Sequence, residues 1–369
     1  MLRPLASPLF LLPVLFLLYT YLLYPLAIRL LARLRPRPPA PTPPNAPPLR
    51  ATAILSALPD APRLREKLRE LLALPPSDAI DAILLGLDGA PPADADALRR
   101  EIPDSRLQIH AFPAPRGKAA VLSDLIPLAT TPALLLLDVR QTVPPGAPEK
   151  LLHALASPDV AVASGELIYA PPSSPDAASA DSYWSFEKKL RAAESAIASV
   201  PGATGALYAI RRSAALPPPP GTLNDDVLIP MRAILSGGRC LFVAGAACHD
   251  APETDLAAEL RRKRRTAAGN WQLLRLEPRL LSPFHNPIFI QFLSHKIFRV
   301  ATPFACLLAY LALIPSLPLF LAATALLLLS MLAALLRRLF PHPLLNLLAA
   351  PFLLNLTLLQ AAFLPTPWR

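Results

Sequence analysis

Long uncharged segments at the two ends of the chain constrain its fold more than any other feature of the sequence. No charged residue occurs in residues 4–28, 300–336 or 339–368. An apolar helix needs about 20 residues to cross a bilayer. The first segment therefore has the length of one span, the second that of two spans with a turn near Pro315 and Pro318, and the third that of one more. We predict one N-terminal and about three C-terminal transmembrane helices.

The first segment has a competing interpretation as a cleavable signal peptide, whose apolar stretch is about 7–15 residues long and ends at a small-residue cleavage site. This segment is longer and is followed by Arg29, Arg33, Arg35 and Arg37, so we expect a retained anchor. Cytoplasmic flanks collect Lys and Arg, which places the C-terminal end of the anchor in the cytoplasm. The remaining alternative is a set of buried helices in a large soluble protein.

The net charge of +10 lies entirely in these flanks. Residues 1–50 hold six Arg and residues 297–369 hold four Arg, both without an acid, whereas residues 51–296 hold 26 basic and 26 acidic residues. A nucleic-acid-binding protein is therefore the weakest interpretation, and we expect no nucleic-acid partner. The arginines instead predict a multi-pass protein of the inner (cytoplasmic) membrane, in contact with membrane lipids and with the middle of the chain in the cytoplasm.

Short apolar runs alternate with helical stretches along the middle of the chain. This alternation predicts an α/β fold with a doubly wound, mostly parallel sheet. Three cysteines in the whole chain exclude a disulfide scaffold. The runs that carry the fold prediction are 51–58, 79–87, 106–112 and 133–137 for strands, and 62–74 and 117–129 for helices.

These patterns divide the chain into five predicted parts. They are a transmembrane anchor at 1–35, a stiff Pro-rich linker at 36–50, a cytoplasmic α/β domain at 51–283, an amphipathic interfacial helix at 284–299, and C-terminal transmembrane helices at 300–369. Within the α/β domain, Asp88 and Asp138 each follow a predicted strand. Ligands of doubly wound sheets bind beyond the carboxyl ends of the strands, so both aspartates are candidate site residues; a turn or helix-capping role is the alternative.

Seven short segments follow one another along this domain. They are Leu87-Asp88-Gly89, 115–120 (Pro-Arg-Gly-Lys-Ala-Ala), 136–141 (Leu-Leu-Asp-Val-Arg-Gln), 164–167, 183–195, 202–212 and Asn224-Asp225-Asp226. In order and spacing they resemble the motifs of membrane-bound bacterial family 2 glycosyltransferases, of the cellulose synthase-like and hyaluronan synthase-like kind. The resemblance implies a GT-A catalytic domain that transfers a sugar from a nucleotide-sugar, with a UDP-sugar as the expected donor.

The resemblance also implies which residues bind the donor. Asp88 corresponds to the aspartate that holds the nucleotide base and ribose, and Arg116 and Lys118 belong to the R-G-K-A segment beside the donor. Near the end of the domain, Arg262 and Arg265 hold the Gln and Arg positions of the family's Q-x-x-R-W motif. We expect both arginines to meet the diphosphate, because a guanidinium matches phosphate geometry.

A divalent cation, Mg²⁺ or Mn²⁺, is the expected cofactor. Asp138 stands at the first position of the family's D-x-D and is the expected metal ligand, because hard cations prefer carboxylate oxygen. Arg140 replaces the second acidic residue, which leaves one carboxylate, diphosphate oxygens and water to hold the ion. Whether His249 or Asp250 adds a ligand from a later loop stays open at this point.

The acceptor side follows from the same resemblance. Asp226 aligns with the last residue of the family's T-E-D motif and is the expected general base, which takes the proton of the attacking hydroxyl. Asp225, Thr204 and Gly205 are expected on the acceptor side. A structural alternative for the aspartate pair is a helix N-terminus, and the two roles are compatible. Direct attack with one base inverts the anomeric carbon.

The expected function is a membrane-bound inverting glycosyltransferase that acts on a growing polysaccharide or a lipid-linked acceptor. Thr266 replaces the Trp that stacks on a growing sugar chain in the family, which favours transfer of one or a few sugars; a buried core role is the favoured interpretation of nearby Trp271. The alternatives are a non-processive lipid glycosyltransferase and an inactive scaffold subunit of a polysaccharide synthase complex. Export or synthase proteins are the further expected partners.

Overall fold

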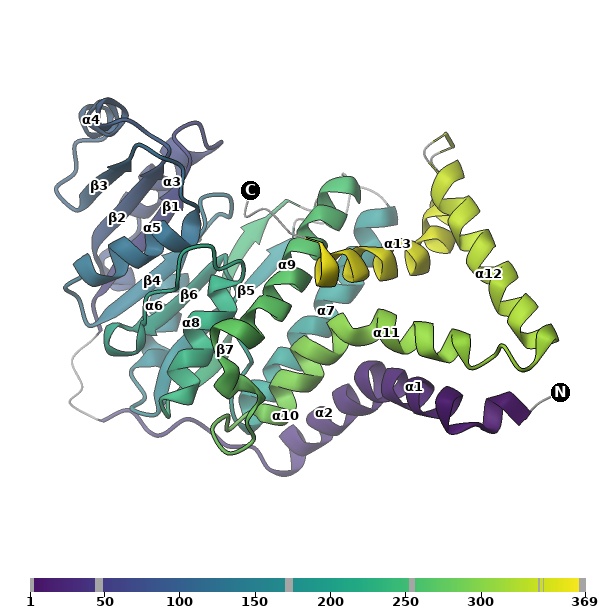
Figure 1. Cartoon of the computed structure of the whole chain (residues 1–369). Coiled ribbons are helices and arrows are strands. Elements are labelled where there is room, and N and C mark those ends of the chain that lie inside the picture. The colour runs from purple at the N-terminus through teal and green to yellow at the C-terminus, as the bar shows by residue number, and fades with distance from the viewer. Residues whose placement is uncertain are drawn as a thin grey trace.

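The computed structural model describes residues 3–43, 49–169, 175–251, 256–337, 339–340 and 342–364, leaving aside the side chains of residues 3–4, 175–184 and 343. An α/β part built on a single sheet and a group of long apolar helices lie on opposite sides of the molecule (Figure 1). Helices α7 (Pro175–Ile197) and α9 (Leu256–Leu276) lie between the α/β part and the long apolar helices.

The α/β part contains one seven-stranded sheet with the order β3-β2-β1-β4-β6-β5-β7. All neighbouring strands are parallel, except that β6 runs antiparallel to both β4 and β5. The predicted mostly parallel sheet is therefore confirmed, with one reversed strand that the sequence pattern did not predict. The strands are β1 (Ala51–Ala57), β2 (Ile80–Asp88), β3 (Leu107–Phe112), β4 (Ala133–Leu137), β5 (Val160–Tyr169), β6 (Leu207–Arg211) and β7 (Arg239–Asp250).

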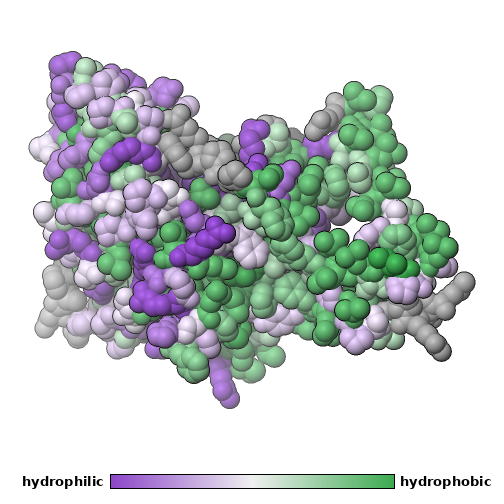
Figure 2. Space-filling view, viewed as in Figure 1, coloured by the Kyte–Doolittle hydropathy of each residue, from purple (hydrophilic) through white to green (hydrophobic). Residues whose placement is uncertain are grey.

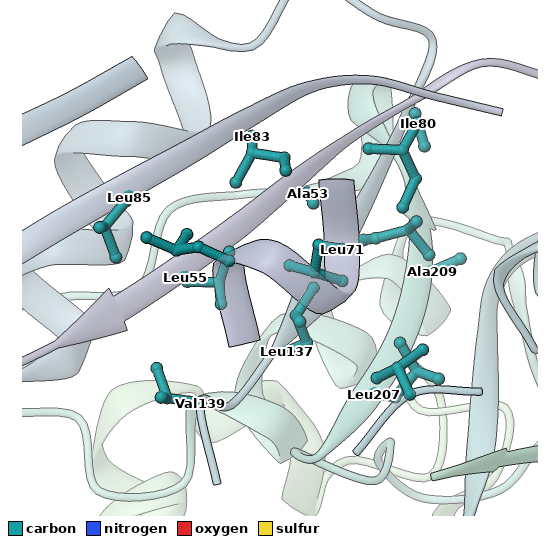
Figure 3. Close-up of a cluster of buried hydrophobic side chains, with 14 of the residues drawn as sticks. Ala53, Leu55, Leu71, Ile80, Ile83, Leu85, Leu137, Val139, Leu207 and Ala209 are labelled. Atoms are coloured by element: carbon teal, nitrogen blue, oxygen red, sulfur yellow. The ribbon is translucent and has the colours of Figure 1, made fainter. Parts of the chain in front are cut away.

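Apolar side chains cover both faces of the sheet, as a doubly wound fold requires. One core contains Leu55, Leu71 and Leu137 and lies under helices α3 (Leu64–Leu72), α4 (Pro92–Glu101) and α6 (Ala147–Leu155) (Figure 3). The opposite core contains Ile54 and Leu134 and lies under α5 (Lys118–Leu125) and α8 (Asp225–Leu235). Adjacent residues of β1 thus enter different cores, because successive side chains of a strand point to opposite faces.

Four helical segments of the described chain are long and apolar enough to cross a membrane: Pro8–Leu34, Phe289–Leu311, Leu317–Leu336 and Leu344–Phe363. Their leucines are largely exposed and form the hydrophobic surface of this side of the molecule (Figure 2). This confirms one N-terminal and three C-terminal candidate spans. The predicted turn near Pro315 falls between α11 (Phe298–Leu311) and α12 (Leu317–Leu336).

The segment that we predict as a separate interfacial helix, 284–299, is not separate in the structure. Helical structure begins at Phe289 and continues without a break to Leu311, through α10 (Phe289–Phe292), a π-helical turn (Leu293–Ile297) and α11. A second π-helical turn (Tyr19–Leu23) joins α1 (Pro8–Leu18) to α2 (Tyr24–Leu34) in the N-terminal span. The two turns are in contact, because the hydroxyls of Tyr19 and Ser294 lie 2.9 Å apart.

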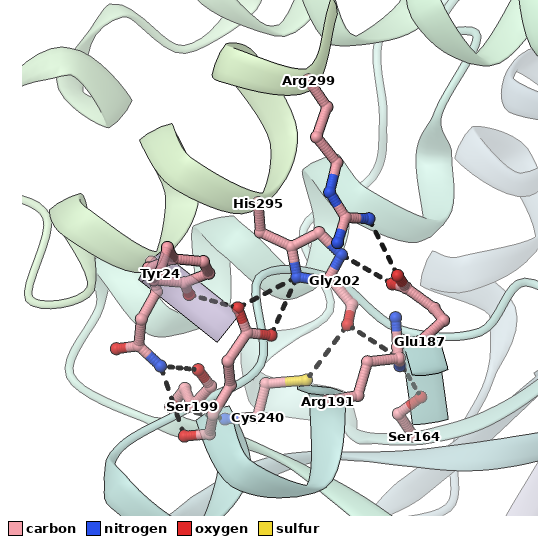
Figure 4. Close-up of polar contacts among 11 residues, drawn as sticks. Tyr24, Ser164, Glu187, Arg191, Ser199, Gly202, Cys240, His295 and Arg299 are labelled. Atoms are coloured by element: carbon pink, nitrogen blue, oxygen red, sulfur yellow. Dashed lines mark hydrogen bonds and ion pairs between the residues drawn. The ribbon is translucent and has the colours of Figure 1, made fainter. Parts of the chain in front are cut away.

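A buried cluster of charged side chains joins these two spans to α7 (Figure 4). The Nε2 atom of His295 lies 2.6 Å from Glu187, and its Nδ1 atom lies 2.9 Å from Glu194. Arg299 donates to Glu187 at 2.8 Å, and the Tyr24 hydroxyl donates to Glu194 at 2.5 Å. Each imidazole nitrogen thus faces a carboxylate, an arrangement that fits a ring donating from both nitrogens. The cluster therefore anchors both spans to the α/β part by buried polar contacts.

The Pro-rich linker is also attached to the α/β part. The buried Arg239 side chain donates to the carbonyls of Arg37 and Pro38 at 2.9 and 3.1 Å. The backbone N–H of Ala40 donates to Asp159 at 2.9 Å, and that of Arg37 donates to the Ala196 carbonyl at 2.7 Å. These bonds fix the Arg37–Ala40 part of the linker against the α/β part.

Candidate active site

Asp88 ends strand β2 and organises the loop before α5. Its two carboxylate oxygens accept hydrogen bonds from the backbone N–H groups of Arg116, at 2.7 Å, and Gly117, at 2.8 Å. Gly117 has φ +87, a conformation that side-chain-bearing residues rarely adopt. Asp88 is nearly fully buried, so it fixes the segment that carries Arg116 and Lys118. The Arg116 guanidinium lies over the Phe112 ring and pairs with Asp124.

Lys118 is the centre of the candidate site. Its ammonium lies 2.8 Å from Asp138, which follows β4, and 3.3 Å from Asp225 at the start of α8. Burial alone would lower the pKa of Lys118, but Asp138 and Asp225 outweigh it and raise this pKa above its ordinary value. Residues 118, 138 and 225 come from three elements, and the structure brings them together at the carboxyl edge of the sheet.

Asp226, the predicted general base, follows Asp225 directly and adjoins this group. A Cβ atom added to Gly205 would lie 3.0 Å from the Asp226 Oδ2 atom, so a larger residue here would have to displace this carboxylate by a few tenths of an ångström. Burial and the neighbouring Asp225 carboxylate raise the pKa of Asp226, although Lys118 acts in the opposite direction. A carboxylate with a raised pKa is a stronger base, which is what proton abstraction near neutral pH requires.

Thr204 is held beside Gly205 by an internal network. Its backbone N–H donates to the Ser164 hydroxyl at 2.9 Å, and its own hydroxyl donates to the Gly165 carbonyl at 2.8 Å. The buried Arg191 guanidinium donates to Ser164 at 2.9 Å and to the Gly202 carbonyl at 3.1 Å. The acceptor-side turn is therefore rigid, and Arg191 links it to α7.

The structure places Arg265, but not Arg262, next to the aspartate pair. Arg265 donates to the carbonyl of Leu223, two residues before Asp225, at 3.2 Å. Arg262 donates to Glu259 and, at 3.1 Å, to the hydroxyl of Tyr169, the last residue of β5.

Trp271 faces the membrane helices rather than the aspartate pair. Its ring packs edge-on against the Phe304 ring, with the two ring centroids 6.3 Å apart. It also packs against the cluster of Ala267, Val300 and Ala361. Its position agrees with the interpretation of Trp271 as a packing residue.

The carboxylates at the candidate metal position fit a site with a single protein ligand. Among the described residues, no three His, Cys, Asp or Glu side chains are grouped so as to enclose an ion. Asp138 is the exposed carboxylate at this position, with 39% of its side chain accessible, whereas Asp250 is 4% accessible and pairs with Arg140 at 2.5 Å. A cation bound at Asp138 would complete its coordination shell with oxygen atoms of a bound ligand and with water.

Two residues outside the predicted set belong to the surroundings of Asp226. The charge of Lys296, on the π-helical turn of the second span, acts on this carboxylate. The buried Tyr208 hydroxyl on β6 has no hydrogen-bond partner among the described residues, and burial and the charges of Asp225 and Asp226 raise its pKa well above the usual range. Sequence spacing gives no signal for Lys296, because 70 residues separate it from Asp226.

Comparison with known proteins identifies relatives for this arrangement. A family model described as glycosyl transferase family group 2 matches residues 133–337, which is more than half of the chain. A mannosyltransferase from Pyrobaculum calidifontis, PcManGT, solved with GDP-Man and Mn²⁺, is 21% identical with a TM-score of 0.66; the match covers 96% of this chain and 97% of that one. GalNAc-T7, solved with UDP, GalNAc and Mn²⁺, is 13% identical with a TM-score of 0.45 over 70% of this chain and 58% of that one. No curated protein matches the sequence.

Proposed function

Because the chain belongs to glycosyl transferase family group 2, and hence is a glycosyltransferase, we propose that it is a membrane-bound inverting enzyme that uses a nucleotide-sugar donor. The observation that carries this proposal is the Lys118 ammonium between Asp138 and Asp225, with the partly buried Asp226 beside them. This group supplies a cation for a departing diphosphate and a carboxylate for the acceptor proton within one site. The narrower likeness to bacterial cellulose synthase-like enzymes stays a prediction.

On the donor side, the chain's own residues hold and neutralise the leaving group. Asp88 orients the Arg116–Gly117 backbone, and we assign the nucleotide to the adjoining edge of the sheet. Lys118 and Arg265 stabilise the negative charge that develops on the diphosphate as it departs. A Mg²⁺ or Mn²⁺ ion held by Asp138 would add Lewis-acid stabilisation of the same charge.

On the acceptor side, Asp226 is the proposed general base. Its raised pKa suits it to accept the proton of the attacking hydroxyl, and Gly205 leaves the room for it to do so. Attack occurs on the face of the sugar opposite the diphosphate, so the anomeric configuration inverts. An α-linked donor would thus give a β-linked product.

We further propose that the acceptor is a growing polysaccharide or a lipid-linked glycan reached from the membrane. The packed position of Trp271 and the replacement at Thr266 leave no aromatic platform from this segment, which favours transfer of one or a few sugars to a lipid-linked acceptor. The proposed orientation places the α/β part on the cytoplasmic side of the inner membrane, in agreement with the positive flanks.

Donor turnover by detergent-purified protein tests this function. UDP- and GDP-sugars are offered with Mg²⁺ or Mn²⁺, and formation of the nucleoside diphosphate is measured with and without an extract of lipid-linked acceptors. Asp226→Asn should lower transfer by about 10²- to 10⁴-fold, whereas Asp96→Asn, in an exposed pair with Arg99, should leave it unchanged. Full activity in Asp226→Asn would contradict the assignment of the base. Absence of turnover with every donor would favour the scaffold alternative.

A further inference from the structure

Arg140 occupies the position at which the family resemblance places a second metal-binding carboxylate. It lies two residues after Asp138, in the loop that follows β4. Its Nη2 group lies 2.5 Å from the Asp250 Oδ2 atom, and Gln141 donates to the same oxygen at 2.8 Å. The Asp250 carboxylate is therefore neutralised by a neighbour instead of being available to an ion.

The Arg140 guanidinium is bound to Asp250 through its Nη2 group, while much of the rest of the side chain is accessible to solvent. Half of its side chain is exposed (52%), whereas Asp250 is buried. Within the described residues its Nε and Nη1 groups have no hydrogen-bond partner. An arginine fixed through one N–H group to a buried carboxylate keeps the rest of its planar fork for an anion.

The backbone around Arg140 is fixed as well. Arg63 donates to the Arg140 carbonyl at 2.5 Å and to the Thr142 hydroxyl at 3.0 Å. Thr142 and His249 exchange backbone hydrogen bonds of 2.8 Å, and the Val143 N–H donates to Glu70 at 2.6 Å. The loop is thus attached to α3 and to the end of β7, so the guanidinium is preorganised and loses little conformational freedom when it binds an anion.

Replacement of an acid by Arg140 changes the electrostatics of the site in two ways. It removes a carboxylate that would hold a divalent cation, and it adds a positive charge that belongs to the protein. Lys118 already contacts Asp138 at 2.8 Å, and Arg140 adds a second protein cation two residues after this single candidate metal ligand. Both effects reduce the share of diphosphate neutralisation that an ion has to supply.

We propose that Arg140 binds the diphosphate of the donor directly, in place of the second metal-binding carboxylate, and that the chain consequently retains nucleoside diphosphate binding when divalent cations are removed. This inference depends on the proposed function, since it assumes a nucleotide-sugar donor at Asp138. A purely structural role, in which Arg140 only attaches the loop to Asp250, makes a different prediction.

Calorimetric titration of the purified full-length protein with UDP and with GDP, in EDTA and in Mn²⁺, separates these roles. In EDTA, wild type should bind one of the two nucleotides within about tenfold of its affinity in Mn²⁺. Arg140→Asp should lose about 10- to 100-fold of the EDTA affinity, the worth of a charge-assisted hydrogen bond, and should regain affinity in Mn²⁺ because a second carboxylate is restored.

Two further variants keep the test independent of folding. Asp250→Asn removes the attachment but keeps the guanidinium, so binding in EDTA should persist or tighten. The double variant Arg140→Ala, Asp250→Asn leaves no buried charge unpaired and should lose binding in EDTA as Arg140→Asp does. A structural role predicts instead that Asp250→Asn is as damaging to EDTA binding as Arg140→Asp.

The outcomes also distinguish this inference from the proposed function. Wild type that binds nucleotide in Mn²⁺ but not in EDTA overturns the role of Arg140 and leaves the proposed function intact. EDTA affinity that is equal in wild type and in the double variant also overturns it. Wild type that binds neither nucleotide under either condition contradicts the proposed function itself.

Discussion

Substitution of His295 by glutamine should destabilise the attachment of the membrane helices more than any substitution of an exposed ion pair. The His295 ring lies between Glu187 and Glu194, which are 7% and 0% exposed, and places one ring nitrogen against each carboxylate. Glutamine supplies donors from one nitrogen and carries no charge. Glu187 would keep Arg299, and Glu194 would keep the Tyr24 hydroxyl, so the loss is two charge-assisted hydrogen bonds rather than full exposure of two orphaned anions.

The magnitude follows from these contacts. At about 1.5–3 kcal/mol for each charge-assisted bond, and in line with the cost of breaking a buried ion pair, His295→Gln should destabilise the protein by about 3–5 kcal/mol. At about 2–4 °C per kcal/mol for a chain of this order of size, the apparent Tm should fall by about 6–20 °C. Arg99→Gln, which breaks the exposed pair with Asp96, should change the Tm by less than about 3 °C.

The chain provides its own reporter for this measurement. Cys240 and Cys248 are fully buried and Cys306 is partly exposed, so in a Cys306→Ser background a thiol-reactive dye reacts only as the detergent-solubilised protein unfolds. The double variant Glu194→Gln, His295→Gln keeps the Glu187–Arg299 pair but removes one of the two carboxylates that face the ring, and should melt above His295→Gln. A His295→Gln protein that melts within about 2 °C of wild type would refute the argument that this cluster is the anchor.

Two further predictions concern the candidate active site. Lys118→Met removes the cation between Asp138 and Asp225 and should lower the transfer rate at least about 100-fold. A loss below tenfold in steady-state kinetics would contradict the role of Lys118. The control is Lys150→Met, which removes an ammonium that donates to the distant Gly245 carbonyl. Because burial and Asp225 raise the pKa of Asp226 above the ordinary aspartate value of 3.8, the rate should fall on acidification at a higher pH than an ordinary aspartate would give. For stability the sign is opposite: protonated Asp226 stabilises the fold fully below about pH 4, and this contribution is lost as the pH rises through the raised pKa. Inactive Asp226→Asn should therefore melt above wild type at pH 7, and an equal or lower Tm in the dye assay would contradict the raised pKa.

Much of the α/β architecture is predictable from local pattern. Strand β4 (Ala133–Leu137) coincides with the predicted run 133–137, because a fully apolar stretch of five residues has no other place than the middle of a sheet. The reversal of β6 was not predictable in this way, since the direction of a strand depends on its neighbours and not on its own residues. The break between α11 and α12 was predictable, because prolines punctuate an apolar run that is too long for one span.

The candidate site was predictable in its members more than in its contacts. Position after a strand marks Asp88 and Asp138, and the motif resemblance adds Lys118 and the aspartate pair. No local pattern, however, places Lys118 between Asp138 and Asp225, or joins Arg140 to Asp250 across 110 residues. Such pairs arise only when separate loops meet at one edge of the sheet, so they need the fold.

The two π-helical turns set the rotational phase of the spans. A π-helical turn accommodates one residue more than regular α-helix, and each residue of an α-helix advances the side-chain direction by about 100°. Ser294 and His295 lie within one such turn, and Tyr19 lies within the other. Deletion of one residue there would turn the lipid-facing side of Phe298–Leu311 by about a quarter of a revolution relative to the sheet. The extra residue in each turn thus shifts the helical register. One face of each span can then pack on α7 while a different face, further along the same helix, is directed to lipid.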